Sequence, residues 1–268
     1  MIKINDNDFN RLEEFIHRCF GINLENKKNL IEGRLGKTIL DMGFSNFTEY
    51  VDYLLSSKSP EALETLINKV TTNHTYFMRE NSHFEFFQNN VLPEIEKNSK
   101  TRSPGIWSAA CSTGEEPYTM SIILLEYFKN KPQSWDTRIL ATDISRRVLS
   151  IAKTGAYSEE SLKEIPEGWK NQYFTRTDGG YKVRKQVMDN VVFREFNLMD
   201  PIKFKTNFDC IFCRNVMIYF DQQTKDALIQ RFYNVLNPGG YLLIGHSETL
   251  NKATSPFKYL MPATYRKV

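Results

Sequence analysis

The sequence contains few cysteines and few histidines, and neither set has the spacing of a metal site. Its 268 residues include four of each type: Cys19, Cys111, Cys210, Cys213, His17, His74, His83 and His246. This cysteine density is too low for a disulfide scaffold, so we expect reduced thiols. The CxxC pair lies in an apolar strand-like stretch without a second CxxC or an HxxxH. We therefore expect core thiols and no metal.

Long apolar runs and long basic tracts are also missing. No stretch approaches the roughly 20 apolar residues of a membrane helix, and MIKINDNDFN lacks the basic and apolar regions of a signal peptide. We expect a cytoplasmic protein without membrane insertion. The net charge is +3, and no basic tract alternates with aromatic residues, which argues against a nucleic-acid partner.

The first 70 residues have the pattern of a small all-α domain. Asp8 can cap a first helix that ends at Gly21, and a second helix covers about residues 27–40. In the second helix we expect Leu30, Ile31, Leu35 and Ile39 to face inward. A third helix covers FTEYVDYLL, and Ser59-Pro60 supplies a cap and a first-turn proline for a fourth.

The second helix carries a basic stripe. At 100° per residue, Lys27, Arg34 and Lys37 project within roughly 80° of one another, while Lys28 falls to one side. Charge alone favours a solvated helix face. The alternative is a docking surface for an acidic helical partner.

From Gly105 onward, apolar strands alternate with helices, which predicts a parallel, doubly wound α/β sheet. The expected strands are IWSAA, TRILATD, VVFREFNL, FDCIFCRN and a late strand after LNPGG, and the helix after IWSAA is expected to start at Pro117. The segment 173–188 contains Asp-Gly between alternating stretches and predicts an inserted antiparallel hairpin. We expect domains at 1–70 and 91–268, a connecting segment at 71–90, and an insert at about 160–190.

The turn CSTGEEPYTM, residues 111–120, follows the first predicted strand. Small residues there let a ligand approach the backbone, but Glu115 and Glu116 occupy the helix start that a pyrophosphate would need. The ligand should therefore be cationic at this end. Asp143 ends the next strand, where an acid can accept hydrogen bonds from ribose hydroxyls; alternatively it caps the following helix, in competition with Ser145. Together these features describe a nucleoside with a cationic tail, such as S-adenosylmethionine.

Asn197 and Leu198 close the strand VVFREFNL. They could hold the edge and the face of an adenine ring, and an ordinary strand-end turn is an equally good interpretation.

Five motifs together resemble the CheR family of bacterial chemotaxis receptor methyltransferases: TTNHTYFMRE, WSAACSTGEEPYTM, ATDIS, FDCIFCRNVMIYFD and LNPGGYLLIGHSE. The resemblance spans nearly the whole chain and implies a Rossmann-like S-adenosylmethionine-dependent methyltransferase domain, a helical N-terminal domain and an inserted β subdomain. It also implies methyl transfer to glutamate side chains on the cytoplasmic helices of chemoreceptors, for adaptation in chemotaxis signal transduction, with S-adenosylhomocysteine as the product.

The resemblance assigns roles to individual residues. The implied cofactor contacts are Asn73, Thr75, Arg79, Glu116, Asp143, Asn197, Leu198, Arg214 and Asn215. Arg79 and Tyr219 match the family residues near the transferred methyl group, although from the residues alone Arg79 could pair with Glu80 and Tyr219 could be core packing. Glu115 is better explained as a first-turn acid that stabilises its helix.

The resemblance also bears on partners. The implied receptor-docking residues are Lys27, Lys28, Arg34 and Lys37. Some family members bind a tethering pentapeptide at the receptor C-terminus through a longer glycine-bearing loop; the loop TRTDGGYK is short, so we expect no such tether.

Two rival functions remain. A methyltransferase for nucleobases would carry an Asp/Asn-Pro-Pro-aromatic motif where this chain has CRNVMIYF. A non-catalytic module that senses S-adenosylmethionine or scaffolds a receptor array would not need Arg79, Glu116, Asp143 and Tyr219 together.

Overall fold

The computed structural model describes residues 2–57, 59–99 and 101–268. The chain folds into two compact units, which we call the helical unit (Met1–Thr72 with Tyr219–Lys225) and the sheet unit (Asn73–Ile218 with Asp226–Val268). The sequence did not indicate that residues 219–225 belong with the first unit. Within the described residues, no helix is long and apolar enough to cross a membrane.

The helical unit is built from α1 (Asp6–Phe20), α2 (Lys28–Asp41), α3 (Phe47–Ser57) and α4 (Pro60–Val70). The cap of α1 differs from the prediction: Asn5 accepts from the backbone N–H of Asp8 at 2.8 Å, so Asp8 lies inside the first turn. Ser59 caps α4 as expected, with Pro60 in its first turn. Gly21 ends α1 in a left-handed conformation, as the sequence predicts.

One expected core residue of α2 is exposed. Ile31, Leu35 and Ile39 are fully buried and recur at i, i+4 and i+8, which is the spacing of one helix face. Leu30 lies about 100° away from Ile31 around the axis, and 44% of it is exposed. The prediction that Leu30 faces inward was therefore wrong.

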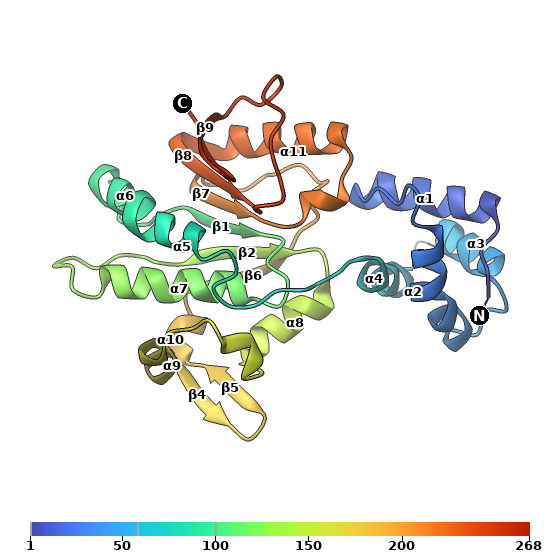
Figure 1. Ribbon diagram of the computed structural model, residues 1–268, viewed down its shortest axis with the longest axis horizontal. Helices are drawn as coiled ribbons and strands as arrows, with labels where there is room; N and C mark the ends of the chain where they lie inside the picture. The colour runs from blue at the N-terminus through green and yellow to red at the C-terminus, as the bar shows by residue number, and fades with distance from the viewer. Residues whose placement is uncertain (1, 58, 100) are drawn as a thin grey trace. The chain divides into compact units, whose positions relative to one another are not determined.

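The sheet unit contains a sheet whose described strands follow the order β6-β2-β1-β7-β8-β10-β9 (Figure 1). Its strands are β1 (Ile106–Ala109), β2 (Ile139–Asp143), β6 (Val191–Glu195), β7 (Phe208–Cys213), β8 (Leu236–Ile244), β9 (Lys258–Met261) and β10 (Thr264–Arg266). The first five run parallel to one another, and β10 is antiparallel to both β8 and β9. The order reverses between β1 and β7, which makes that point the topological switch.

Helices cover the two faces of this sheet. They are α5 (Ser82–Phe86), a π-helical turn η1 (Phe87–Val91), α6 (Leu92–Asn98), α7 (Glu115–Phe128), α8 (Arg146–Thr154) and α11 (Gln222–Val235). Apolar residues of α5, α6 and α7 pack with Ile106 and Phe212 in one core cluster. Trp107, the neighbour of Ile106 in β1, points to the other face and contacts Phe232 of α11. The doubly wound prediction is thus confirmed.

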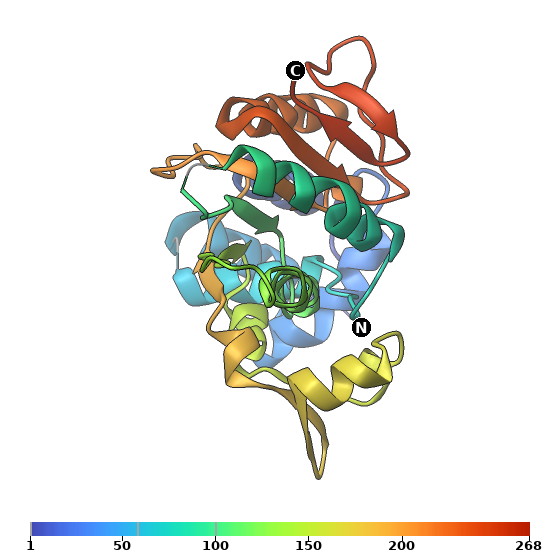
Figure 2. The same cartoon turned by 90° about the vertical axis from the view of Figure 1, so that its left-hand side faces the viewer.

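The inserted subdomain is a three-stranded sheet of order β3-β5-β4 rather than a single hairpin. Its β4–β5 hairpin is seen at the bottom of the view in Figure 2. Its elements are β3 (Ala156–Tyr157), η2 (Glu160–Leu162), α9 (Glu167–Tyr173), β4 (Phe174–Thr177), β5 (Gly180–Val183) and α10 (Lys185–Met188). Strands β4 and β5 pair antiparallel, with Thr177 opposite Gly180, which confirms the two-residue Asp178-Gly179 turn. The third strand comes from residues just after α8, outside the predicted hairpin.

Candidate active site

The candidate site lies at the carboxyl ends of three adjacent parallel strands. β2, β1 and β7 end at Asp143, Ala109 and Cys213, and the residues that follow each strand meet at the switch point of the sheet. The two cysteines of the CxxC pair are buried in β7 with free thiols, as expected.

The backbone after β1 is held in conformations that side chains rarely adopt. Ala110, Ser112 and Gly114 have φ angles of 63°, 50° and 96°. A Cβ on Gly114 would lie 2.9 Å from the Cβ of Ala152 and 3.0 Å from the hydroxyl of Tyr157. Such left-handed residues cost free energy and cluster at functional sites. Gly114 is the N-cap of α7, which therefore starts at Glu115, two residues before the predicted start at Pro117.

Asp143 is held by backbone donors on both sides. Its Oδ2 accepts from the N–H of Ser112 and its Oδ1 from the N–H of Ser145, each at 2.9 Å. The cap of α8 is Ser145, whose hydroxyl accepts from the N–H of Val148, so Asp143 is free of the capping role that the sequence left open. Burial raises the pKa of Asp143, while these backbone N–H groups oppose the rise.

The two first-turn acids of α7 have different partners. Glu115 accepts from the hydroxyl of Thr113 at 2.7 Å and is buried, which fits a residue that stabilises the turn. Glu116 accepts from the hydroxyl of Ser108 at 2.7 Å and from Nη1 of Arg214 at 3.1 Å. Burial raises the pKa of both carboxyl groups, and in Glu116 the charge of Arg214 opposes that rise.

Glu80 is a central residue of the site, although the sequence indicated it only as a possible partner of Arg79. Its Oε2 accepts from Nη2 of Arg214 at 3.0 Å, and its Oε1 accepts from the side-chain amide of Asn215 at 3.1 Å. Burial alone would raise the pKa of Glu80, but the charge of Arg214 and the hydrogen bonds lower it overall. Its φ of 55° is as unusual as that of Asn215, at 58°. In the sequence, only the position of Glu80 beside Arg79 could have indicated its role, because the hydrogen-bond partners of Glu80 lie far along the chain.

The segment 73–80 runs beside the start of α7. The carbonyl of Asn73 accepts from the hydroxyl of Ser112 at 3.5 Å, and the N–H of Met78 donates to Thr119 at 3.4 Å. Thr75 is half-buried on this segment. The guanidinium of Arg79 donates to the carbonyl of His74 at 2.8 Å, rather than pairing with Glu80.

The residues after β6 form a tight turn. The side-chain carbonyl of Asn197 accepts from the N–H of Met199 at 3.0 Å, and Leu198 is buried. Nη2 of Arg231, on α11, donates to the carbonyl of Leu198 at 2.6 Å. The strand-end turn is present, and it carries the buried apolar side chain of Leu198. A strand-end turn and a contact with an adenine ring are therefore compatible interpretations of this segment.

Tyr219 lies in the helical unit, in the segment 219–225. Its carbonyl accepts from the N–H of Asn23 at 2.8 Å, and Phe220 forms an isolated antiparallel bridge with Ile22. His17 of α1 hydrogen-bonds Asp221 in the same segment. Backbone contacts with residues 22 and 23 therefore fix the position of Tyr219. Local sequence patterns could not indicate these contacts, because the two segments lie far apart in the chain.

The four basic residues predicted for docking differ in their surroundings. Nζ of Lys28 pairs with Asp6 at 2.6 Å, and Nζ of Lys27 donates to the carbonyl of Asn23 at 2.9 Å. Arg34 donates to the carbonyl of Val70 and to the hydroxyl of Thr72, both at 2.9 Å, so it secures the end of α4. The side chain of Lys37 is exposed and makes no hydrogen bond or ion pair with any described residue.

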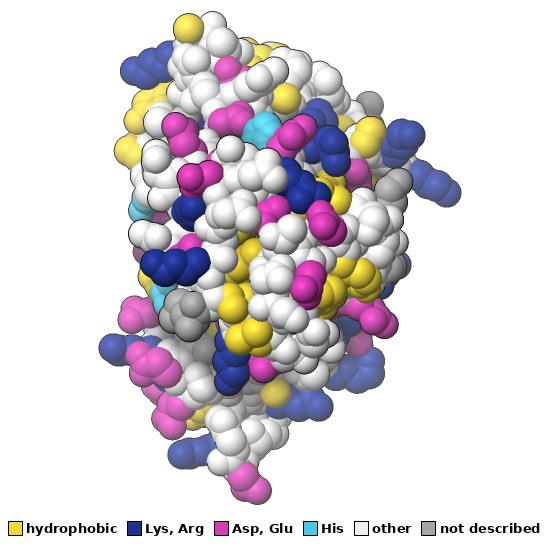
Figure 3. Space-filling view, turned by 90° about the vertical axis from the view of Figure 1, so that its right-hand side faces the viewer, with side chains coloured by type: hydrophobic (Ala, Val, Ile, Leu, Met, Phe, Trp, Pro, Cys, Tyr) yellow, Lys and Arg dark blue, Asp and Glu magenta, His cyan; other side chains and the backbone are white. Residues whose placement is uncertain are grey.

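Surface charge is mixed on the face that Figure 3 shows. Lysine and arginine side chains alternate with aspartate and glutamate, and apolar side chains are exposed among them. On this face, a charged partner would therefore meet a local patch rather than a broad field of one sign.

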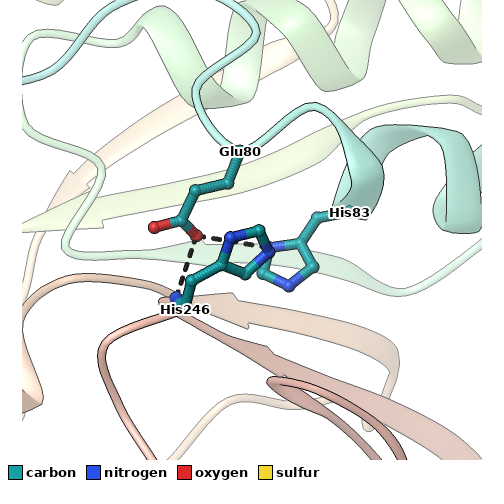
Figure 4. A group of neighbouring side chains, drawn as sticks. All are labelled: Glu80, His83 and His246. Atoms are coloured by element: carbon teal, nitrogen blue, oxygen red, sulfur yellow. Dashed lines mark hydrogen bonds and ion pairs between the residues drawn. The ribbon is translucent and has the colours of Figure 1, made fainter.

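Glu80, His83 and His246 come together in space, although their spacing in the sequence gave no sign of it (Figure 4). The Nδ1 of buried His83 lies 3.5 Å from Oε2 of Glu80, and the rings of His83 and His246 make an edge contact at 4.6 Å. Burial and the charge of Arg214 lower the pKa of His83 to about 3, so its ring is neutral at physiological pH. Oε2 of Glu80 already accepts from Arg214 and from the N–H of His246, which leaves it little capacity for a metal ion.

These groups fit a ligand with hydroxyls at one end and a positive charge at the other. Asp143 is a buried carboxylate at the end of β2, and Glu115 and Glu116 occupy the positive end of α7, where they would repel a pyrophosphate. A doubly wound sheet with this site defines an S-adenosylmethionine-dependent methyltransferase. Residues 73–266 match the CheR methyltransferase S-adenosylmethionine-binding domain, and residues 7–71 match the CheR methyltransferase all-alpha domain. The chain belongs to the CheR methyltransferase family.

Curated relatives match over nearly their full length. The chain is 44% identical to the chemotaxis protein methyltransferase of Borreliella burgdorferi, covering 99% of this chain and 96% of that protein. It is 37% identical to chemotaxis protein methyltransferase 2 of Vibrio cholerae, over 96% of this chain and 90% of that protein. It is 34% identical to the chemotaxis protein methyltransferase of Escherichia coli, over 93% of this chain and 87% of that protein.

Proposed function

We propose that this protein transfers the methyl group of S-adenosylmethionine to glutamate side chains on the cytoplasmic helices of chemotaxis receptors. The products are glutamate methyl esters and S-adenosylhomocysteine. The observation that carries the proposal is the match of both CheR domains, from residue 7 to residue 266, in a chain whose strand ends bring Glu116, Asp143 and Arg214 to one edge of the sheet.

We assign the cofactor-binding residues by what their side chains can do. Asp143 accepts hydrogen bonds from hydroxyls, and Glu116 attracts a positive charge. Asn197 and Leu198 offer a polar and an apolar contact to a purine. The other residues that we assign to cofactor binding are Asn73, Thr75, Arg79, Arg214 and Asn215.

The reaction needs little acid-base assistance. When bound, S-adenosylmethionine supplies a methyl group on a positively charged sulfur. The acceptor glutamate has an ordinary pKa near 4.3, so it is ionised and nucleophilic at neutral pH without a general base. What remains for the protein is to align the acceptor with the methyl carbon and to exclude water.

Arg79 and Tyr219 are the residues that we assign to this alignment. The guanidinium of Arg79 uses one donor on the carbonyl of His74, and its planar fork has further donors that suit a carboxylate. The hydroxyl of Tyr219 can donate a hydrogen bond to the acceptor.

Receptor docking is assigned to α2. Its arc of basic residues, Lys27, Arg34 and Lys37, also includes exposed Leu30, which suits a helical partner with acidic and apolar positions. Lys27, Lys28 and Arg34 have intramolecular partners, so we assign the direct contact chiefly to Lys37 and Leu30. We expect no C-terminal pentapeptide tether, because the β4–β5 turn has two residues. On this proposal the protein works in the cytoplasm, at arrays of membrane-embedded receptors.

The proposal is tested by incubating the full chain with methyl-labelled S-adenosylmethionine and receptor cytoplasmic fragments. Label that enters the fragments and is released by mild base as methanol supports the proposal, because carboxylate methyl esters are base-labile. Cofactor binding without transfer would instead support a sensing or scaffolding module. An Asp143→Asn variant, which replaces a charged acceptor by an amide, is the control and should transfer much less label.

A further inference from the structure

The residues that follow β6 lie beside the acid that we assign to the ribose. Strands β6 and β2 pair in parallel, with Glu195 opposite Asp143. Directly after β6, the N–H of Phe196 donates to the carbonyl of Asp143 at 3.0 Å. The base of a nucleoside is bonded directly to its ribose. A base whose ribose is held by Asp143 is therefore close to residues 197–200, which we call the β6 turn.

Three hydrogen bonds hold the β6 turn. The N–H of Asp200 donates to the carbonyl of Asn197 at 2.9 Å, which closes a β-turn. The N–H of Met199 donates to the side-chain carbonyl of Asn197 at 3.0 Å. The third bond comes from α11, where Nη2 of Arg231 donates to the carbonyl of Leu198 at 2.6 Å. The conformation of the turn therefore depends on one residue that is distant in the sequence.

A single peptide group links Arg231 to the side chain of Asn197. The carbonyl of Leu198 and the N–H of Met199 belong to the same peptide. A charged donor on that carbonyl polarises the peptide and strengthens the hydrogen bond that its N–H donates. Because this N–H holds the side-chain oxygen of Asn197, Arg231 acts on the orientation of that amide through the peptide.

Stability alone does not explain an arginine at this position. The neighbouring Phe232 packs against Trp107, so α11 is anchored to the sheet by apolar contacts. The Nε of Arg231 is buried and has no hydrogen-bond partner among the described residues, which costs free energy that an apolar side chain would avoid. Burial also lowers the pKa of Arg231, and the charge of Asp200 in the β6 turn opposes this fall. Both interactions that favour the charged guanidinium are thus made with the turn.

We propose that Arg231 is a positioning residue for adenine recognition: by holding the carbonyl of Leu198, it fixes the β6 turn so that Asn197 meets the edge of the base. This inference rests on the proposed function, which assigns Asn197 and Leu198 to the adenine ring. Arg231 acts through the turn, so its loss weakens binding of the base without disturbing the alignment of the methyl group.

The test measures, by calorimetry, the dissociation constants of S-adenosylhomocysteine and of S-inosylhomocysteine, in which hypoxanthine replaces adenine. The full-length wild type should prefer the adenine ligand. Arg231→Met removes the donor and keeps a long side chain. It should weaken binding of the adenine ligand about tenfold and that of the hypoxanthine ligand clearly less, so the preference falls. Equal weakening of both ligands would overturn the proposal, because a general loss of structure does not distinguish the two bases.

A double-mutant cycle tests whether Arg231 acts through Asn197. In an Asn197→Ala background, Arg231→Met should change the dissociation constant of S-adenosylhomocysteine by about twofold or less, because the side chain that it orients is already gone. Losses that simply add would show that the two residues act independently and would refute the proposal.

Arg138→Met is the matched control. Arg138 is an exposed arginine that pairs with Asp136 at the end of β2 opposite Asp143, and its loss should leave both dissociation constants at their wild-type values. If Arg231→Met does not fold, Arg231→Gln carries the test, because its shorter, uncharged side chain should also lower the preference for adenine. An unchanged preference in that variant contradicts the proposal.

Methylation kinetics separate this inference from the proposed function. In Arg231→Met, KM for S-adenosylmethionine should rise about tenfold, while kcat at saturating cofactor stays within about twofold of the wild type. A wild type that binds S-adenosylhomocysteine but transfers no methyl group to receptor fragments refutes the proposed function and leaves the binding test valid. A wild type that methylates receptors, with an unchanged adenine preference in Arg231→Met, refutes only the inference.

Discussion

At the scale of single residues, the site contains three acids, two of which pair with one buried cation. Asp143, Glu80 and Glu116 are all partly or fully removed from water, and Arg214 pairs with the last two. A buried charge without a partner is strongly destabilising, so these residues depend on one another. Glu116 and Asp143 could be inferred from their places after predicted strands. Glu80 could not, because its role depends on Arg214, which follows a strand far along the chain.

The first prediction concerns Arg79. Arg79→Ala should reduce kcat on receptor fragments on the order of a hundredfold, because the acceptor carboxylate would lose its alignment. The variant should keep its fold, since within the described residues the guanidinium makes one hydrogen bond, to the carbonyl of His74. Steady-state methylation kinetics and a thermal melt check both points. Near-wild-type turnover in a folded variant would remove Arg79 from the mechanism.

The second prediction concerns the acid stability of Glu80. Its pKa is lowered from the ordinary value of 4.5 by Arg214 and by hydrogen bonds, against burial, so the ionised form stabilises the fold at neutral pH. This contribution is present above the unfolded-state pKa and is lost as the pH falls through the folded-state pKa. The difference in unfolding free energy between wild type and Glu80→Gln should be about 1–3 kcal/mol near pH 7.

Urea unfolding from pH 7 down to about pH 3 measures that difference. It should shrink below about pH 4, because Glu80 then becomes protonated and loses its charge interaction with Arg214. Carboxyl groups distant from Glu80 titrate equally in both proteins, so their contributions cancel. A difference that stayed constant or grew on acidification would show that the charge of Glu80 does not stabilise the fold.

At the scale of elements, local patterns predicted the strands and helices that lead to the site, and they failed where distant segments meet. The alternation after Gly105 indicated β1, α7, β2 and α8 in order. The start of α7 was misplaced because Gly114, in a left-handed conformation, already caps the helix. The third strand of the insert and the pairing of residues 219–225 with the helical unit arise from contacts between distant segments, which neither periodicity nor turn chemistry specifies.

The third prediction concerns the turn before α7. Gly114→Ala should destabilise the protein by about 1–3 kcal/mol and weaken cofactor binding, because φ is 96° and the new Cβ would contact Ala152. Gly168 is the matched control: it lies in α9, and a Cβ there would meet no atom within 4 Å. Gly168→Ala should be neutral or slightly stabilising. Equal melting temperatures for the two variants would contradict the constraint at Gly114.

At the scale of the whole molecule, the chain combines a helical unit with a basic helix and a sheet unit with an acidic site. A net charge of +3 gives no strong overall attraction to an acidic partner. Recognition must then rest on a local surface, and Lys37 on α2 is an exposed cation without a partner among the described residues. Arg34, which the sequence placed in the same stripe, hydrogen-bonds the end of α4.

The fourth prediction separates these two residues. Lys37→Glu should lower the methylation rate of receptor fragments several-fold at low salt, and the loss should shrink as salt screens the surface charge. Its melting temperature should stay that of the wild type, whereas Arg34→Gln should lower it. Lys252→Glu, at an exposed position in the sheet unit, makes the same change in net charge and is the control. Equal methylation rates for Lys37→Glu and Lys252→Glu would exclude α2 as the docking helix.

The central claim is that this protein esterifies receptor glutamates, and mass spectrometry of a receptor fragment after reaction tests it most directly. The account predicts that, with S-adenosylmethionine and wild-type protein, specific glutamates on the cytoplasmic helices each gain one methyl group, which mild base removes. After the same reaction time, Arg79→Ala should modify a fraction of these peptides that is smaller on the order of a hundredfold. Methylation on another residue type, or base-stable methylation, would contradict the account.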